Sequence, residues 1–181
     1  MPLANSRFAS AGALVLIEEI VLAADGVLNF DAIPATFKDL RLSAMVRSNE
    51  PAVSTAGLNL RYNGDAGLNY DRCQLVSNAA GTLSSVSATN AQAQAFLADQ
   101  PAALSQADTW AALLLEISDY RSARRKQAMY RVVSNDPGGG GFELAHGLVA
   151  WRSNAVIDRV EILALGFAFL AGSRGSLYGV S

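Results

Sequence analysis

The chain has 181 residues, of which 51% are hydrophobic and 17% are charged, and its 14 basic and 16 acidic side chains leave a formal net charge of −2. This length suffices for one domain with a sizeable core, and the slightly acidic balance excludes the basic footprint of a general nucleic-acid binder. The longest apolar run, Ile162 to Gly172, is about half the length that a membrane-spanning helix requires, so we expect no membrane partner. An apolar excess without a membrane segment indicates buried contacts between subunits.

The N-terminal residues 1–12 are rich in small and polar residues, and we expect an arm that could extend to a neighbouring subunit. No positively charged segment precedes the apolar stretch Leu14–Ala23, so a cleaved signal peptide is not expected. Residues 14–22 suit a helix by their length and by the adjacent Glu18 and Glu19, whereas their β-branched residues suit a strand. We favour the strand.

Several segments alternate between apolar and polar residues, which is the pattern of a strand with one buried side and one solvent-facing side. The alternation is clearest in residues 40–47 and recurs in residues 58–63 and 127–132. The apolar members are Leu40, Leu42, Ala44, Val46, Leu58, Leu60, Tyr62, Ala128, Tyr130 and Val132.

The C-terminal part of the chain is more apolar. Residues 159–164 alternate, and the following segment, Leu165–Leu170, is apolar on both sides, which predicts a strand covered on both faces. Trp151 to Ile157 leads into this region, and we expect Trp151, Tyr178 and Gly179 to belong to a packed closing part of the fold.

Turn-forming residues separate these segments, at Asp25-Gly26, Asn63-Gly64-Asp65, Ala80-Gly81 and Asn135-Asp136-Pro137. The four glycines that follow, Gly138 to Gly141, predict a mobile loop between strands. A phosphate-cradling loop would need to open a helix and to carry a lysine, and Phe142-Glu143-Leu144 supplies neither.

Residues 80–108 match none of these patterns. From Thr89 to Asp108 the composition shifts to Ala, Gln, Ser and Asp, and we interpret the region as an insertion that is irregular or holds a short helix broken before Pro101. Six or more strands at fairly regular spacing, without alternating helices, predict an all-β fold. We expect an antiparallel β-sandwich of jelly-roll type with a short helical or irregular insertion, formed as a single domain by residues 13–181.

Candidate catalytic residues are few. His146 is the only histidine, which removes every multi-histidine metal site and makes a structural or surface role the expected one. Cys73 is the only cysteine, so no intrachain disulfide can form, and we expect a buried, inert thiol.

Glycoside hydrolysis would need two carboxylates that flank the scissile bond. The local candidates are Glu18 with Glu19, Glu116 with Asp119, and Asp158 with Glu161. Adjacent strand residues point to opposite faces, and the other two pairs are as easily solvated. We therefore expect no enzyme, no catalytic residue, no cofactor and no metal ion.

Two polar segments allow alternative interpretations. Residues 63–71 place oxygen-bearing side chains at alternate positions, as a calcium loop does, but they lack the later bidentate glutamate and the glycine at the sixth position. Asx turns, in which Asn and Asp bind nearby backbone amides, explain the same residues more economically. The basic cluster Arg121–Lys126 fits a polar turn between two strands, either solvated or paired with acids of a neighbouring subunit.

Five elements of this sequence occur in the same order in a family of small structural proteins of tailed bacteriophages, which the chain resembles. They are Arg47-Ser48, Tyr62 to Asp65 with Asn69-Tyr70, Ile117 to Tyr120 with Lys126, Trp151 to Ile157, and Gly172 to Gly179 with its Leu-Tyr-Gly ending. No single element is specific, but the order is preserved over most of the chain. The departure is the segment from Ala80 to Asp108.

The resemblance implies a jelly-roll β-sandwich on the surface of a virion that is assembled in the cytoplasm of a bacterial host. The first expectation is a head decoration (cement) protein that binds and stabilises the capsid as a homo-oligomer, with a homotrimer favoured and the major capsid protein or another virion protein as partner. The alternative is a tail-associated receptor- or carbohydrate-binding module. Exposure of Tyr62, Tyr70 and Trp151 in one cleft would support that alternative, and their burial would weaken it.

Overall fold

The structure, a computed structural model, describes residues 12–78, 83–136 and 141–181. This part of the chain forms twelve β-strands and no helix. The strands are β1 (Leu14–Val21), β2 (Leu28–Phe30), β3 (Asp39–Val46), β4 (Thr55–Tyr62), β5 (Tyr70–Asn78), β6 (Leu83–Gln92), β7 (Ala95–Pro101), β8 (Ala111–Ser118), β9 (Lys126–Asp136), β10 (Gly141–Trp151), β11 (Val160–Ala164) and β12 (Arg174–Val180).

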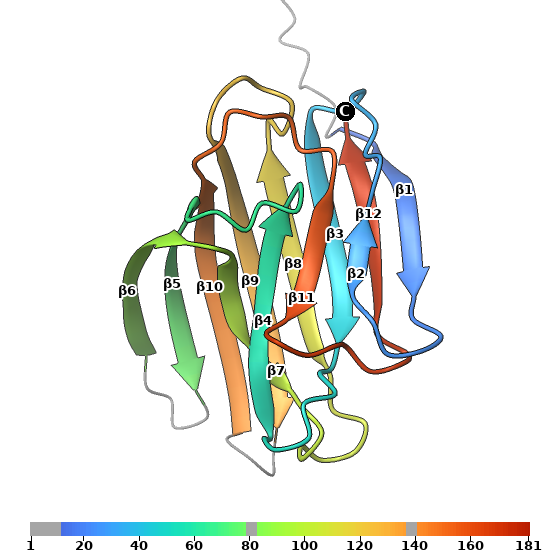
Figure 1. The fold of residues 1–181 in the computed structure, drawn as a ribbon, viewed down its shortest axis with the longest axis vertical. Coiled ribbons are helices and arrows are strands. Elements are labelled where there is room, and N and C mark those ends of the chain that lie inside the picture. The colour runs from blue at the N-terminus through green and yellow to red at the C-terminus, as the bar shows by residue number, and fades with distance from the viewer. Residues whose placement is uncertain (1–11, 79–82, 137–140) are drawn as a thin grey trace, which may run out of the picture.

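The strands form two antiparallel sheets of different width. The larger sheet has eight strands in the order β1-β12-β3-β8-β9-β10-β5-β6, and the smaller has four in the order β2-β11-β4-β7. The small sheet lies across one face of the large one, with β1 and β6 at the two margins of the large sheet (Figure 1). The prediction of an all-β, jelly-roll-like antiparallel sandwich is confirmed.

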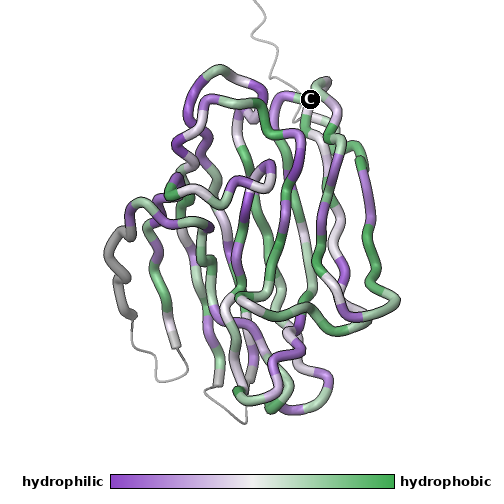
Figure 2. The backbone as a smooth tube through the Cα atoms, in the orientation of Figure 1, coloured by the Kyte–Doolittle hydropathy of each residue, from purple (hydrophilic) through white to green (hydrophobic). Residues whose placement is uncertain are grey.

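Hydrophobic and hydrophilic residues follow one another along the strands (Figure 2). Their alternation determines which side of each strand is buried. In β3, Leu40, Leu42, Ala44 and Val46 are buried and face the small sheet, and the residues that alternate with them face outward. The core continues through the predicted apolar members of β4 and β9. The expected strand at residues 14–22 is present as β1.

The segment from Ala80 to Asp108 corrects the expectation of a helical or irregular insertion. Its described residues provide β6 and β7, which extend β5 and β4 respectively. Leu97, Ala98 and Ala102 are completely buried. The sequence did not indicate these strands because their residues are mostly small or polar. Strand β7 packs Ala side chains against its neighbours, whereas large β-branched residues are the usual signal of a strand.

One C-terminal prediction also differs from the structure. Strand β11 ends at Ala164, and Leu165 and Phe167 are 52% and 43% exposed in the turn that follows, so residues 165–170 are not a doubly covered strand. Gly166 has a φ of 74°, a left-handed conformation that turns the chain. Residues 152–159 connect β10 to β11 as a loop.

In the described part of the chain, no helix is long and apolar enough to cross a bilayer. The arm expected at residues 1–12 lies, apart from Gly12, outside the described residues, and so does most of the glycine-rich loop at 138–141.

Gly147 provides a test of how tightly the inner face is packed. It lies in the middle of β10, and a Cβ atom there would stand 2.6 Å from both the Cys73 carbonyl oxygen and the Tyr130 hydroxyl. We expect Gly147→Ala to lower the free energy of unfolding by about 1–3 kcal/mol, measured by urea denaturation, because neither neighbour can move freely. Gly26→Ala is the control, since the nearest atom to its Cβ would belong to the Leu22 side chain at 3.5 Å, an ordinary van der Waals distance. Equal stability of the two variants would contradict this account.

Candidate functional site

The outer face of the eight-stranded sheet is the most distinctive surface of the molecule. We define the apolar face as the large outward side chains of this sheet that remain at least one-third exposed. They are Leu14, Leu16, Val21, Met45, Leu75, Met129, Val133, Phe142, Leu144 and Leu148. Monomeric soluble proteins rarely expose contiguous apolar surface on this scale, so the face has the character of an interaction site.

Strand register aligns these side chains into rows across the sheet. One row runs from Leu144 through Val133 and Ala112 to Met45, and continues across Arg174 to Val21 on β1. Side chains directly opposite each other on antiparallel strands lie about 4.5–5.5 Å apart, so the row is a continuous apolar strip. The Nη2 atom of Arg174 lies 3.1 Å from the Met45 sulfur, which keeps its aliphatic stem on the strip.

A second row carries an ion pair. It runs from Leu148 and Met129 to Glu116, Arg41 and Tyr178. The Arg41 Nη2 atom donates to Glu116 Oε1 at 2.5 Å, so this pair is satisfied within the chain. Since the two side chains are 42% and 34% exposed, we expect the ion pair to hold them in one orientation and to add little to the free energy of unfolding.

Between these rows lies a third, in which Leu75, His146, Arg131 and Leu114 stand side by side. His146 and Arg131 are exposed, and Arg131 has no ion-pair partner among the residues that the structure describes. The sequence prediction of a surface histidine is consistent with this position. An arginine within an apolar surface can form one polar contact, at a defined place, with a protein bound to this face.

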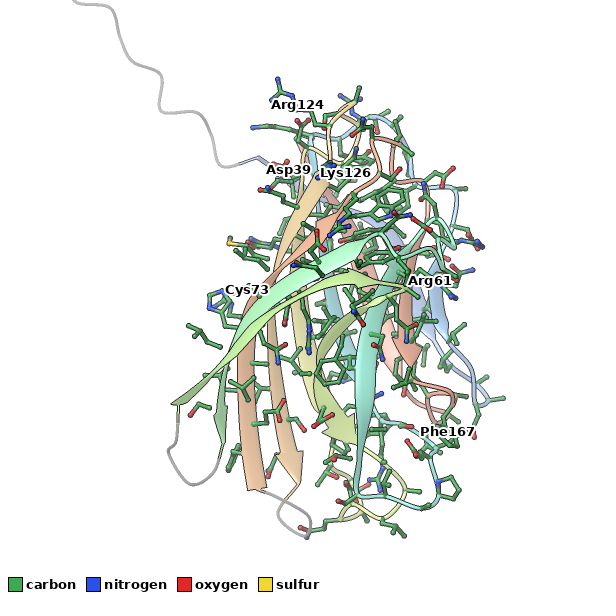
Figure 3. All side chains as sticks on the ribbon, turned by 60° about the vertical axis from the view of Figure 1, so that its left-hand side comes forward. Asp39, Arg61, Cys73, Arg124, Lys126 and Phe167 are labelled. Carbon is green, nitrogen blue, oxygen red and sulfur yellow. The ribbon has the colours of Figure 1, made fainter. Side chains whose placement is uncertain are left out.

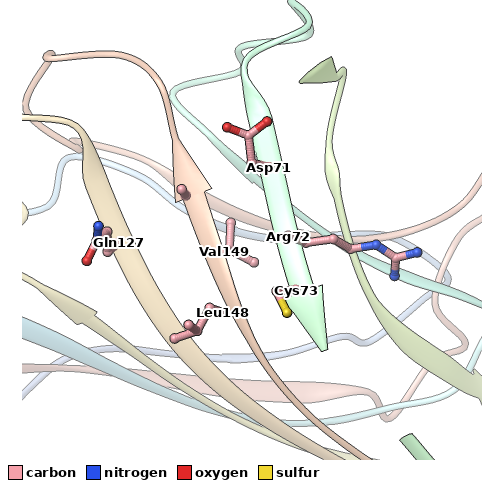
Figure 4. Close-up of a pocket in the computed structure, with 7 residues that line it drawn as sticks. Asp71, Arg72, Cys73, Gln127, Leu148 and Val149 are labelled. Carbon is pink, nitrogen blue, oxygen red and sulfur yellow. The ribbon is translucent and has the colours of Figure 1, made fainter. Parts of the chain in front are cut away.

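A shallow depression of about 230 Å³ lies on this face where β9, β10 and β5 run side by side (Figure 4). Cys73, Gln127 and Leu148 line it. Cys73 is exposed here, which corrects the expectation of a buried thiol: it occupies an outward position of β5, between the inward positions of Arg72 and Gln74. Figure 3 shows Cys73 on the side of the molecule away from Phe167.

The aromatic residues of the expected sugar platform are in the core instead. Tyr62, Tyr70 and Trp151 are 1%, 0% and 2% exposed, and their ring centroids lie 5.6–6.5 Å apart. The Tyr70 hydroxyl accepts a hydrogen bond from the Tyr62 amide at 2.8 Å. These three rings therefore cannot stack on a sugar.

Asp65 explains why the segment at residues 63–71 has its composition. Its carboxylate accepts hydrogen bonds from the Gly67 amide at 2.8 Å, from Asn69 Nδ2 at 2.9 Å and from Trp151 Nε1 at 2.7 Å. Burial opposes ionisation, but these three donors together lower the pKa of Asp65. The oxygens that a calcium ion would use are engaged within the turn, as the Asx-turn interpretation expected.

Two of the three carboxylate pairs singled out in the sequence have one member in an ion pair with an arginine. Glu116 pairs with Arg41, and the Nε atom of Arg61 donates to Glu161 at 3.0 Å. Glu18 and Glu19 are consecutive residues of β1. Within the described ranges, no group of three or more His, Cys, Asp or Glu side chains could hold a metal ion.

The basic cluster Arg121–Lys126 forms the turn between β8 and β9, as predicted, and lies at the end of the molecule shown by Arg124 and Lys126 in Figure 3. Lys126 is 1% exposed, and its ammonium group donates to the carbonyls of Ser122 at 2.6 Å and Arg124 at 2.7 Å. Burial lowers the pKa of Lys126, while Asp119 acts in the opposite direction. This lysine closes the turn rather than binding a partner.

The other elements of the phage resemblance are structural as well. Arg47 donates to the carbonyls of Gln106 at 2.9 Å and Ser105 at 3.1 Å, which secures the loop after β7. The Tyr120 hydroxyl donates to the Pro34 carbonyl, and the Tyr120 carbonyl accepts from the Ile157 amide at 3.1 Å. These residues therefore hold loops of the sandwich in place.

Sequence reasoning missed a carboxyl pair between the sheets. The Asp99 amide of β7 donates to Glu143 Oε1 of β10 at 3.2 Å, and both side chains are half-buried. Burial raises the pKa of Asp99, although Arg72 opposes it, and burial also raises the pKa of Glu143, to which the charge of Asp99 adds. No local signal links residues 44 positions apart, because the packing of β7 against the large sheet brings them together.

The apolar face was also missed, although a signal existed. In β10, outward Leu144 and Leu148 alternate with inward Ala145 and Val149, so the strand is apolar on both sides. A doubly apolar strand in an antiparallel sheet indicates a second covered face.

No protein-family model matches this chain, and no curated protein matches it. Among solved structures, a chain from the structure of infectious bursal disease virus, Gx strain, is similar at 15% sequence identity, with a TM-score of 0.13. The alignment covers 100% of this chain and 45% of that chain, so this chain spans less than half of its length. A likeness this low supports neither a fold nor a function.

Two phenylalanine substitutions test the aromatic cluster. Tyr70→Phe removes the acceptor of the buried Tyr62 amide, and we expect a loss of about 1–3 kcal/mol in the free energy of unfolding. Tyr62→Phe is the matched variant, because the Tyr62 hydroxyl has no hydrogen-bond partner among the described residues. It should leave stability unchanged or raise it by about 1 kcal/mol. Urea denaturation of both proteins checks this, and a larger loss in Tyr62→Phe would refute it.

The carboxyl pair predicts a pH dependence. Because the folded-state pKa values of Asp99 and Glu143 are raised, the folded chain binds more protons than the unfolded chain, and their contribution to stability falls as pH rises above about 4.3 through the raised pKa values. We expect Glu143→Gln, which keeps the Oε1 acceptor, to raise the Tm at pH 7 by about 2–4 °C and to flatten the decline. Exposed Glu19→Gln is the control and should do neither. Thermal scans of the wild type and both variants between pH 4 and 8 measure the Tm at pH 7 and its decline with pH.

Proposed function

We propose that this chain is a bacteriophage virion structural protein, and specifically a head decoration protein that attaches to the capsid surface through its apolar face. The observation that carries the proposal is that face: a sheet buried on one side by its own partner sheet and apolar on the other side. A protein that must cover a lattice needs a broad, nearly flat contact surface and no catalytic residue.

Further support comes from the phage-like sequence elements, which hold the ends of the sandwich together. The partner would be the major capsid protein or another virion protein, and the location would be the virion surface. We propose a homo-oligomer, for which the resemblance favours a homotrimer. In that arrangement each attached copy contributes an apolar face, and avidity adds to individually weak contacts.

The alternative role is a receptor- or carbohydrate-binding module on the tail. It depended on an exposed aromatic platform, and the burial of Tyr62, Tyr70 and Trp151 removes the platform that the sequence offered. The neighbouring polar residues Arg131 and His146 lie between apolar Leu75 and Leu114, so they offer a sugar few polar contacts.

Immunogold electron microscopy of purified virions tests the location. We expect label spread over the head, and label confined to the tail would refute the decoration role. Leu148→Lys, which charges the middle of the apolar face, should reduce labelling at least tenfold, because a lysine buried in an apolar contact must be desolvated. The control is Leu104→Lys in a loop off the face, where the native side chain is 64% exposed. Equal labelling of Leu148→Lys and the wild type would show that attachment uses another surface.

A further inference from the structure

The four strands at the margins of the two sheets differ in how they are protected. Strand β2 has three residues, and β7 ends in Pro101 and carries a register irregularity against β4. Strand β6 is rich in Ser, Thr and Asn and has two irregularities against β5. Short length, proline, polar residues and bulges are the usual means by which proteins prevent edge-to-edge pairing. Strand β1, with eight residues, lacks them in its first half.

The first half of β1 is apolar on both sides. Leu14, Val15 and Leu16 are consecutive and 49%, 45% and 52% exposed. A bulge between Leu16 and Glu18 interrupts the pairing with β12, and Glu18 and Glu19 follow directly. The unprotected apolar part of the β1 edge is therefore limited to Leu14, Val15 and Leu16, which precede the bulge.

The backbone of this segment has an unused side. Strand β12 pairs with one side of β1, and no described strand pairs with the other. An exposed apolar edge of this kind is a template for one more strand, because backbone N–H and C=O groups supply the affinity and flanking side chains the specificity. The occupant must therefore be an extended segment that is itself apolar on both faces.

We infer that the occupant is β1 of a second copy of this chain, paired antiparallel about a two-fold axis that passes beside Val15. In this register Val15 lies opposite its own counterpart, and Leu14 of each copy lies opposite Leu16 of the other. We call this contact the β1 seam. It does not depend on the proposed virion role.

The charge pattern of β1 supports this occupant. In the β1 seam, Glu18 lies opposite Gly12, so the acidic pairs of the two copies sit at opposite ends of the contact. They are about six residues or 20 Å apart along the strand, and at physiological salt charges separated by more than about 8 Å are largely screened. A shift of the axis toward Glu18 would bring the four carboxylates together, so the same residues select the register.

The β1 seam also continues the apolar face. Leu16 and Tyr178 are register partners on the outer side, as are Leu14 and Val180. Pairing two copies places these side chains beside their counterparts and joins the two large sheets into one. An isologous contact closes as a dimer, so the β1 seam is compatible with a threefold assembly only within a hexamer of dihedral symmetry.

The experiment is sedimentation equilibrium of the full chain over a range of concentrations, comparing wild type with Leu16→Lys and Leu148→Lys. Leu16 and Leu148 are both 52% exposed on the outer face, but only Leu16 is on the edge strand, so the two variants are matched. We expect a dimer or hexamer for the wild type and for Leu148→Lys, and at least a tenfold weaker association for Leu16→Lys. Thermal scans confirm that each variant is folded.

Crosslinking tests the register independently. In a Cys73→Ser background, Val15→Cys should form an intermolecular disulfide, because directly opposite residues lie about 4.5–5.5 Å apart, within disulfide range. Val21→Cys, at an exposed position beyond the acidic pair, should not.

Three results would overturn the inference. One is a wild-type monomer or simple trimer that Leu16→Lys leaves unchanged. Another is dissociation by Leu148→Lys alone, which would place self-association on the apolar face. The last is unchanged self-association of Leu16→Lys combined with lost virion attachment, which would assign the edge to a strand of the capsid. Failure of the proposed attachment through the apolar face would show instead as equal immunogold labelling of virions by Leu148→Lys and by the wild type. The two failures are therefore distinguishable.

Discussion

The packing of the four-stranded sheet onto one face of the eight-stranded sheet is the contact on which the rest of the structure depends. Because strand residues alternate between faces, covering one face turns every second residue of the large sheet outward. In most antiparallel sandwiches those outward residues are polar. Here many of them are Leu, Met, Val or Phe, so the large sheet buries one apolar face internally and exposes apolar side chains on the other.

The ends of the sandwich are held by polar groups that are satisfied within the chain. Asp65 accepts three hydrogen bonds beside the buried Tyr62, Tyr70 and Trp151, and Lys126 binds the carbonyls of its own turn. Buried polar groups with complete partners specify one arrangement of loops, since each lost partner would cost free energy. These contacts therefore fix the loops beside Asp65 and Lys126.

The proposed attachment to the capsid and the inferred self-association use separate parts of one surface. The middle of the large sheet offers apolar side chains whose backbone groups are already paired, which suits a side-chain contact with a lattice. The β1 edge offers unpaired backbone groups, which suits another strand. The sheet can therefore serve both roles at once, because neither contact covers the other.

The sequence alone determined the all-β class, the inward residues of β3, β4 and β9, the turn at Asn63-Gly64-Asp65, and the local role of Asp65, since all of these follow from period-two alternation and short-range hydrogen bonding. It misplaced β6 and β7 because their small and polar residues carry no strand signal. Only the tertiary structure decided that Tyr62, Tyr70 and Trp151 are buried together, that Cys73 faces outward, that Asp99 meets Glu143, and that β1 is an edge. Those outcomes depend on which strands become neighbours, and strand order is set by packing between residues far apart in the chain, which no local pattern records.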